Sequence, residues 1–131
     1  MRVLNPSASW LVSVLCEGDY TVAATLGRAE STVYDAICFH AQQCIEKYLK
    51  AWLVEHESTF PKIHDLEALA KQYLPSLPDL ALLMDELRLL TSFAVEIRYP
   101  GTSAERQDTE NCWQTAVRAR RLIRRHLGIE E

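Results

Sequence analysis

The sequence predicts an all-α fold, an up-and-down four-helix bundle with one additional short helix. Helical periodicity recurs along the chain, and no run of alternating apolar and polar residues suggests a sheet. Four long helical segments and one short segment are joined by brief loops, which places successive helices as antiparallel neighbours. The 131 residues are 48% apolar and contain no repeat, linker or low-complexity segment. We therefore expect one domain over residues 1–131.

The first helix begins at Asn5-Pro6-Ser7, where Asn or Ser can cap the helix and proline suits its first turn. It extends to about Gly27–Ala29. Gly18 is a weak point inside it, because glycine is a poor helix former. Apolar residues at helical spacing predict its buried side, namely Trp10, Val14, Val22 and Leu26.

The second helix is the longest, from a cap at Ser31 to about His56. Some 25 residues at about 1.5 Å per residue make it about 37 Å long, so it needs a partner of similar length. One continuous stripe is built to be buried, and it consists of Tyr34, Ile37, Ala41, Ile45, Tyr48 and Trp52.

The third helix is short. It opens at His64-Asp65-Leu66 and ends near Tyr73–Leu74, before Pro75 and Pro78 mark a turn.

The fourth helix begins at Asp79 and continues to about Ile97, where Tyr99-Pro100-Gly101 ends it. Its apolar face is predicted to be Leu80, Leu83, Leu87, Leu90 and Ala94. The last helix runs from about Ala104 to His126 and is capped by Gly128. Its buried face is predicted to be Cys112, Trp113, Ala116, Ile123 and Leu127.

Composition excludes several classes of protein. The formal charge of −4 argues against a general nucleic-acid-coating protein. The four cysteines show no metal-type spacing with histidine, so we expect packed, reduced thiols and no metal site. Reduced thiols suit the cytoplasm. No targeting signal is evident, and no segment approaches the roughly 18 apolar residues of a membrane span.

A polar stripe lies opposite the buried stripe of the second helix. His40, Gln43, Lys47 and Lys50 fall at spacings of three, four and three, which gather on one narrow side at about 100° per residue. Such a row can bind an anion or a partner carboxylate. The competing interpretation is a solvated face, and the spacing of Glu46 and Lys50 for an i,i+4 ion pair supports it.

Two further motifs allow a functional and a structural interpretation. Lys62 and His64 can line an anion site at a helix start, or His64 and Asp65 can simply stabilise the helix end. Arg98 beside Tyr99 can hold a phosphate or carboxylate, or Arg98 can complement the negative end of the helix.

The last helix is rich in arginine, with Arg118, Arg120, Arg121, Arg124 and Arg125 followed by His126. Solvation and complementation of the helix dipole explain these residues. The alternative is a basic strip for RNA or an acidic partner. RNA is the less favoured ligand, because no aromatic residue interleaves with the arginines as a base-stacking surface requires.

Four segments in this order resemble the HEPN domain family (higher eukaryotes and prokaryotes nucleotide-binding). Residues 16–24 look like its A-x-x-D-L-x-x-A-A pattern, and residues 39–51 look like F-H-A-Q-Q-A-A-E-K-x-L-K-A. Residues 62–66 match K-x-H-D-L, and residues 98–100 match R-Y-P. No single motif is specific, but the four in sequence are, and together they span nearly the whole chain.

The resemblance implies a bundle of four to five helices that is commonly a homodimer. Such small proteins are often encoded beside a minimal nucleotidyltransferase, some of these pairs act as toxin–antitoxin modules, and nucleotide binding has been proposed for the family. Many relatives are metal-independent ribonucleases with an Arg followed, after four to six residues, by His. Here no His follows Arg98 at that distance. Arg120 and Arg121 have such a spacing to His126, but far from where the family's site is expected.

We therefore expect a non-catalytic or weakly catalytic HEPN protein that serves as partner of a nucleotidyltransferase, with nucleotide as its candidate ligand and no cofactor. The groups expected to contact phosphate or another anion are His40, Gln43, Lys47, Lys50, Lys62, His64, Arg98 and Tyr99. The carboxylates expected to support them are Asp19, Glu46 and Asp65. Two alternatives are a metal-independent ribonuclease toxin and a purely structural dimerisation module.

Overall fold

All regular structure in the described part of the chain is helical. The computed structural model describes residues 4–28, 34–56, 66–72, 78–96 and 105–129, and no strand occurs in these ranges. The helices are α1 (Pro6–Trp10), the π-helix η1 (Leu11–Cys16), α2 (Glu17–Arg28), α3 (Tyr34–Glu55), α4 (Leu66–Lys71), the 3₁₀-helix η2 (Pro78–Leu83), α5 (Met84–Glu96) and α6 (Arg106–Leu127). The predicted all-α class is confirmed.

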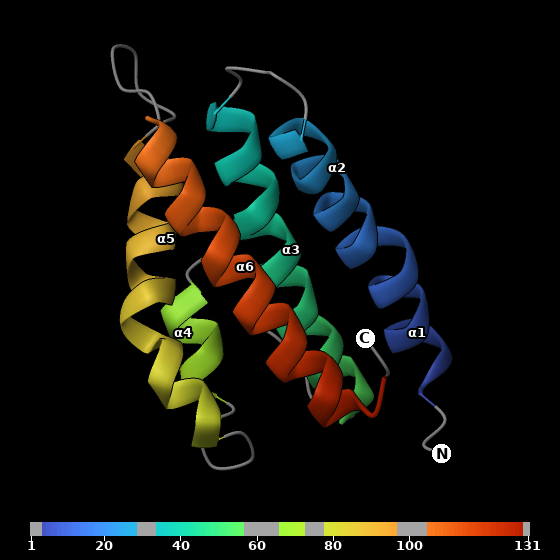
Figure 1. Ribbon diagram of the computed structural model, residues 1–131. Helices are drawn as coiled ribbons and strands as arrows, with labels where there is room; N and C mark the ends of the chain where they lie inside the picture. The colour runs from blue at the N-terminus through green and yellow to red at the C-terminus, as the bar shows by residue number, and fades with distance from the viewer. Residues whose placement is uncertain (1–3, 29–33, 57–65, 73–77, 97–104, 130–131) are drawn as a thin grey trace.

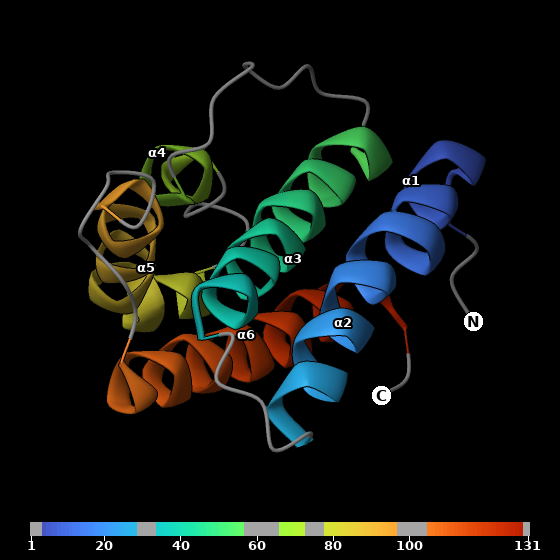
Figure 2. The ribbon, with the colours of Figure 1, turned by 90° about the horizontal axis from the view of Figure 1, so that it is seen from above.

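Helix α3 lies in the middle of the fold (Figure 2). Its most extensive contacts are with α6, and it also packs against α2 on one side and α4 and α5 on the other. In Figure 1 the chain rises along α1, η1 and α2, descends along α3, rises along α5 and descends along α6. The distribution of polar and apolar side chains around α3 therefore determines which groups are buried in the core and which can reach solvent.

The first expected helix is one continuous rod made of α1, η1 and α2 (Figure 1). Asn5 caps it as predicted, and its side-chain oxygen accepts a hydrogen bond from the Ser7 N–H at 2.8 Å. A π-helical turn was not predicted. Its hydrogen bonds span five residues instead of four, which changes the phase of the helix.

The predicted buried side of this rod is wrong. Trp10, Val14 and Val22 are 55%, 49% and 39% exposed, and Leu26 is half-buried. The rod carries apolar residues on two sides, so periodicity alone could not decide between them. The side that is buried also holds a carboxylate with partners on α3, and it consists of Ala8, Val12, Cys16, Asp19 and Ala23.

The core forms where α3 meets the other helices. Of the predicted stripe on α3, Tyr34 is half-buried and the rest is buried. The largest fully buried hydrophobic side chains are Tyr48, Ile45, Leu49, Leu66, Leu69, Leu80, Leu87, Ile123 and Leu127. Burying each aliphatic side chain of this size contributes about 1.5–3 kcal/mol. All four cysteines are buried and free, as expected.

The last two long helices follow the prediction with changes at their ends. The fourth segment starts as the 3₁₀-helix η2 and becomes α-helical only at Met84. Its leucines at 80, 83, 87 and 90 are buried as predicted, and the side chain of Ala94 lies outside the described residues. Helix α6 begins with a capping box of Glu105 and Asp108, and ends at Gly128 with φ 76°. Its predicted face is buried except for Trp113, which is half-buried.

Within the described ranges, no helix is long and apolar enough to cross a membrane.

Candidate functional site

The polar stripe on α3 is tied to α2 through a buried carboxylate. Asp19 is only 9% exposed, and its two oxygens accept hydrogen bonds from α3: Oδ1 from His40 Nδ1 at 2.7 Å and Oδ2 from Lys47 Nζ at 2.5 Å. The bond to His40 requires a hydrogen on Nδ1. A single carboxylate thus fixes two side chains that lie two helical turns apart.

A second carboxylate organises the other half of the stripe. Glu46 is 3% exposed and accepts hydrogen bonds from Gln42 Nε2 at 3.2 Å and from Lys50 Nζ at 3.0 Å. Gln43 Nε2 in turn donates to Gln42 Oε1 at 2.9 Å. The predicted Glu46–Lys50 ion pair is therefore present, and it is largely buried instead of solvated.

The stripe is neither a solvated face nor part of the apolar core. The side chains of His40, Lys47 and Lys50 are 28%, 25% and 15% exposed. Removing a carboxylate from water is costly unless it is paired and hydrogen-bonded. Asp19 and Glu46 meet that condition, and they hold the cationic ends at fixed positions with access to solvent. We call Asp19, His40, Gln43, Glu46, Lys47 and Lys50 the α3 polar site.

The remaining predicted site residues fall on parts of the chain that the structure does not describe. They are Lys62, His64, Asp65, Arg98 and Tyr99. The structure thus brings together the α2 and α3 members of the expected site.

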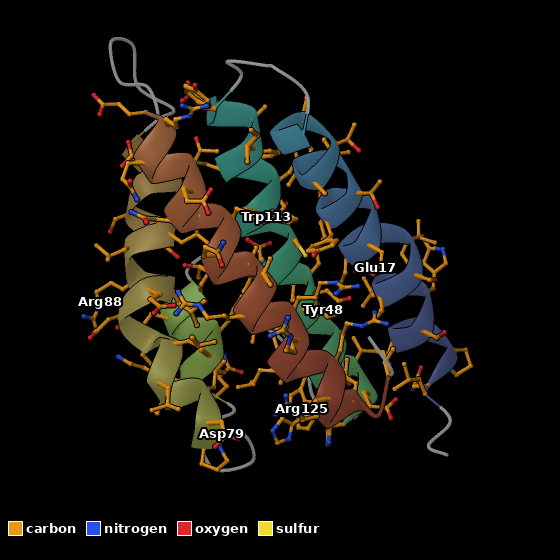
Figure 3. The ribbon with its side chains drawn as sticks, viewed as in Figure 1. Glu17, Tyr48, Asp79, Arg88, Trp113 and Arg125 are labelled. Carbon is orange, nitrogen blue, oxygen red and sulfur yellow. The ribbon has the colours of Figure 1, made fainter. Side chains whose placement is uncertain are left out.

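A second charged cluster was missed by the sequence reasoning. Glu17 of α2, Tyr48 of α3, and Arg120 and Arg124 of α6 form a network across three helices, and Figure 3 shows Glu17 and Tyr48 facing one another. Tyr48 Oη donates to Glu17 Oε2 at 2.7 Å and accepts from Arg124 Nη1 at 3.0 Å. Arg120 donates to both Glu17 carboxylate oxygens, from Nε to Oε2 at 3.0 Å and from Nη2 to Oε1 at 2.7 Å. We call these four residues the Glu17 network.

Burial and hydrogen bonding shift the pKa of Glu17 in opposite directions. Burial by itself raises the pKa of Glu17, but hydrogen bonds from Arg120 and Tyr48 and the two guanidinium charges outweigh it, so the pKa is lowered. Burial raises the pKa of Tyr48 strongly, and the neighbouring carboxylate adds to the effect. The network therefore holds an ionised Glu17 and a neutral Tyr48, the states required for the observed hydrogen bonds.

An aromatic ladder accompanies the network. The Arg120 guanidinium lies 4.2 Å from the ring centroid of Tyr20, and Tyr20 stacks on Trp113 with centroids 5.0 Å apart. No aromatic residue interleaves with the arginines along the last helix, and the ring beside Arg120 comes from another helix. Tyr20 comes from α2, which spacing within the last helix could not show, whereas Trp113 lies seven residues before Arg120 on the same helix and could have been noticed.

Several arginines of the last helix are engaged inside the protein. Arg120 binds Glu17, Arg124 is 9% exposed within the Glu17 network, and Arg118 pairs with Glu86 of α5 at 2.7 Å. Of the five arginines from Arg118 to Arg125, Arg121 and Arg125 are exposed and take no part in these three pairs, although Arg121 has an interaction of its own. The engaged arginines favour structural roles over an RNA-binding strip.

The Arg–His spacings at the end of the last helix do not place these side chains on one side of the helix. His126 packs edge-on against Trp52 of α3, with ring centroids 6.1 Å apart. Arg120 points to Glu17 instead. Arg121 precedes His126 by five residues, which puts them about 140° apart around the helix.

A hollow of about 370 Å³ lies between α5 and α6, lined by Glu86, Leu89, Leu90, Asp108, Asn111, Cys112, Gln114, Thr115 and Arg118. The guanidinium in this hollow, that of Arg118, is already paired with the carboxylate of Glu86. The hollow therefore does not favour an anionic ligand. Among the described residues, no group of three or more His, Cys, Asp or Glu side chains is arranged to hold a metal ion.

Comparison with known proteins decides the family. The sequence model of the HEPN domain matches residues 16–126. The chain belongs to the HEPN domain family. The matched part of this HEPN protein contains both the α3 polar site and the Glu17 network. No curated protein and no solved structure matched the chain.

Proposed function

We propose that this HEPN protein binds nucleotide through phosphate at the α3 polar site, as the partner subunit of a minimal nucleotidyltransferase. The observation that supports the site is the pair of buried carboxylates, Asp19 and Glu46, which orient the cationic ends of Lys47 and Lys50. A side chain that is already fixed loses less conformational entropy when it binds a ligand.

The chemistry of Lys47 suits a phosphate. An ammonium carries three N–H donors, and the bond to Asp19 uses one of them. The others can reach a phosphate oxygen from the solvent side, where Lys47 is 25% exposed. His40 adds a ring nitrogen beside it. Lysine acts on phosphates as a point charge, so a fixed position matters more than a fork geometry.

The proposal includes residues and partners expected from the resemblance. Lys62, His64, Arg98 and Tyr99 complete the anion site, and Asp65 supports them. The protein is proposed to be cytoplasmic, homodimeric and part of a toxin–antitoxin pair. An up-and-down bundle is the proposed topology, supported by the alternating directions of the long helices in Figure 1.

A thermal-shift titration with millimolar ATP or GTP tests the binding site. A ligand that binds only the folded state at 100 times its Kd adds about 2.7 kcal/mol of stability. We expect such a shift for the natural protein and its loss in Lys47→Gln. Lys71→Gln is the matched control, since that side chain is 64% exposed on α4.

The comparison is between ligand-induced shifts, because Lys47→Gln also leaves Asp19 with less pairing and lowers the starting melting temperature. Equal shifts in Lys47→Gln and Lys71→Gln would exclude the α3 polar site. No shift in the natural protein would favour the purely structural alternative.

Two further experiments test the rest of the proposal. Co-expression with a minimal nucleotidyltransferase encoded by the neighbouring reading frame should give a stable complex. Incubation of the pure protein with RNA should give no cleavage. Robust cleavage that is lost in His126→Ala would replace the proposed role with that of a ribonuclease.

A further inference from the structure

Two of the four buried cysteines face each other across the interface between α3 and α6. Cys38 is the fifth residue of α3, and Cys112 is the seventh residue of α6. Both helices run downward in Figure 1, so these early turns lie at the same end of the bundle. The two thiols are hydrogen-bonded to each other. Their sulfur atoms therefore already point toward one another, which is the first geometric requirement of a disulfide.

The two thiols hold their protons unequally. The hydrogen bond from the Cys112 thiol lowers the pKa of Cys38 and outweighs the opposing effect of burial. The same bond, together with burial, raises the pKa of Cys112. The carboxylates of Asp108 and Asp35 oppose the ionisation of Cys38 less strongly. Because the thiolate is the reactive form of cysteine, Cys38 is the member of the pair that reacts first.

The hollow between α5 and α6 gives small molecules a path to this pair. Cys112 lines the hollow of about 370 Å³ and is 5% exposed, whereas Cys38 is 0% exposed. A volume of about 10–15 Å³ is enough to hold one water molecule, and hydrogen peroxide is larger by a single oxygen atom. An oxidant of this size that enters the hollow reaches Cys112 and the hydrogen-bonded Cys38 beside it.

The other two cysteines lack these features. Cys16 of η1 and Cys44 of α3 also lie close enough to influence each other's ionisation, but burial raises the pKa of both thiols strongly. Neither of them lines the hollow. The chain therefore contains a pair of cysteines with a path for an oxidant and a second pair that serves as an internal comparison.

We propose that Cys38 and Cys112 are a peroxide-sensitive dithiol that closes reversibly to a disulfide between α3 and α6. The Cys38 sulfur first attacks one oxygen of hydrogen peroxide, the O–O bond breaks, and a sulfenic acid and one water are formed. The Cys112 sulfur then displaces the oxygen from Cys38 as a second water, which takes up the Cys112 proton. Both sulfurs are oxidised and both peroxide oxygens are reduced, so two thiols and one peroxide give one disulfide and two waters.

The disulfide should stabilise the protein measurably. It would join residues 74 positions apart in the sequence, on the two helices with the most extensive contact in the fold. A cross-link over so long a loop removes conformational entropy from the unfolded chain. We expect oxidation to raise Tm by about 10 °C. A small thiol reverses the bond by exchange, as is usual for sensing disulfides inside cells. The proposal does not rest on nucleotide binding.

Peroxide treatment followed by peptide mapping tests the proposal. The natural protein is incubated with hydrogen peroxide, unfolded, alkylated at its remaining thiols and analysed by mass spectrometry. Two of its four thiols should disappear, and one peptide pair should be linked through Cys38 and Cys112 within a single chain. These two thiols should be lost at least about tenfold faster than Cys16 and Cys44. Dithiothreitol should restore all four thiols and the original Tm.

Two variants separate the pair from the other cysteines. Cys112→Ala should abolish both the linked peptide and the rise in Tm. Cys44→Ala is the matched control, since it removes another buried thiol of α3, and it should form the disulfide like the natural protein. The proposal would be overturned if the natural protein kept all four thiols in excess peroxide, or if its linked peptides joined Cys16 to Cys44 or one chain to another. The peptide map of the natural protein decides this even where a variant does not fold.

Discussion

Replacing Tyr48 by phenylalanine tests whether the Glu17 network stabilises the fold. The change removes one hydroxyl from a ring that is 0% exposed and leaves its apolar packing in place. That hydroxyl donates to Glu17 at 2.7 Å and accepts from Arg124 at 3.0 Å, so both of its partners are charged. Both would lose a hydrogen bond in a place where water cannot fully replace it.

The magnitude follows from these two bonds. A hydrogen bond to a charged group contributes about 1.5–3 kcal/mol, and a buried partner left unsatisfied costs about as much. Arg120 still holds Glu17 through two bonds, which limits the loss. We expect Tyr48→Phe to lower the free energy of unfolding by about 2–3 kcal/mol. For a chain of this size that corresponds to about 6–12 °C in Tm.

Urea denaturation followed by circular dichroism measures the effect. Tyr20→Phe is the control, because it removes a hydroxyl that has no hydrogen-bond partner among the described residues and keeps the ring stacked on Trp113. A double-mutant cycle with Glu17→Gln should give a coupling energy of about 1 kcal/mol or more. A loss below about 0.5 kcal/mol for Tyr48→Phe, equal to that of Tyr20→Phe, would refute the reasoning.

Three further predictions concern pH, thiols and a helix end. The pKa of Glu17 is lower in the folded protein than its value near 4.5 in the unfolded chain. The stability that ionised Glu17 contributes is therefore fully present above pH 4.5, and it is lost as the pH falls through the pKa of the folded state. Stability should therefore drop below about pH 4.5, and less steeply in Glu17→Gln, as equilibrium unfolding at several pH values will show. The thiols of Cys16 and Cys44 are buried, and burial raises their pKa strongly. These two thiols should therefore react with a thiol reagent much more slowly in native than in unfolded protein. Equal reaction rates would contradict their burial. Gly128 has φ 76°, so Gly128→Ala should cost about 1 kcal/mol in the same urea assay, and no cost would show that the end of α6 readjusts.

The fold class was predictable because helix periodicity and end signals are local. The Asn5 cap, the Gly128 end and the buried stripe of α3 follow from neighbouring residues, and all are present. The buried side of the first helix was not predictable in this way. The first helix has two apolar stripes. Which of them is buried depends on the partners that Asp19 and Glu17 have on other helices, α3 and α6.

The candidate site shows the same division. Helical spacing along α3 predicts that His40, Lys47 and Lys50 share one side of the helix. The Glu46–Lys50 ion pair is an i,i+4 contact, which is also predictable from sequence. The Glu17 network joins residues more than 30 positions apart. No local pattern relates an arginine of the last helix to a carboxylate of the first, so sequence assigned that arginine to solvent.

The bond between Glu17 and Arg120 connects residues 103 positions apart, which has a consequence for the order of events during synthesis. The first helix leaves the ribosome with a carboxylate whose main partner does not yet exist. Contacts of such long range form late, since a large loop must close before they contribute. Glu17 therefore lacks its guanidinium partner until the last helix has been made, although the rod can pack on α3 before then. A chain that ended before Arg120 would leave this carboxylate with the Tyr48 hydroxyl as its remaining partner in the Glu17 network.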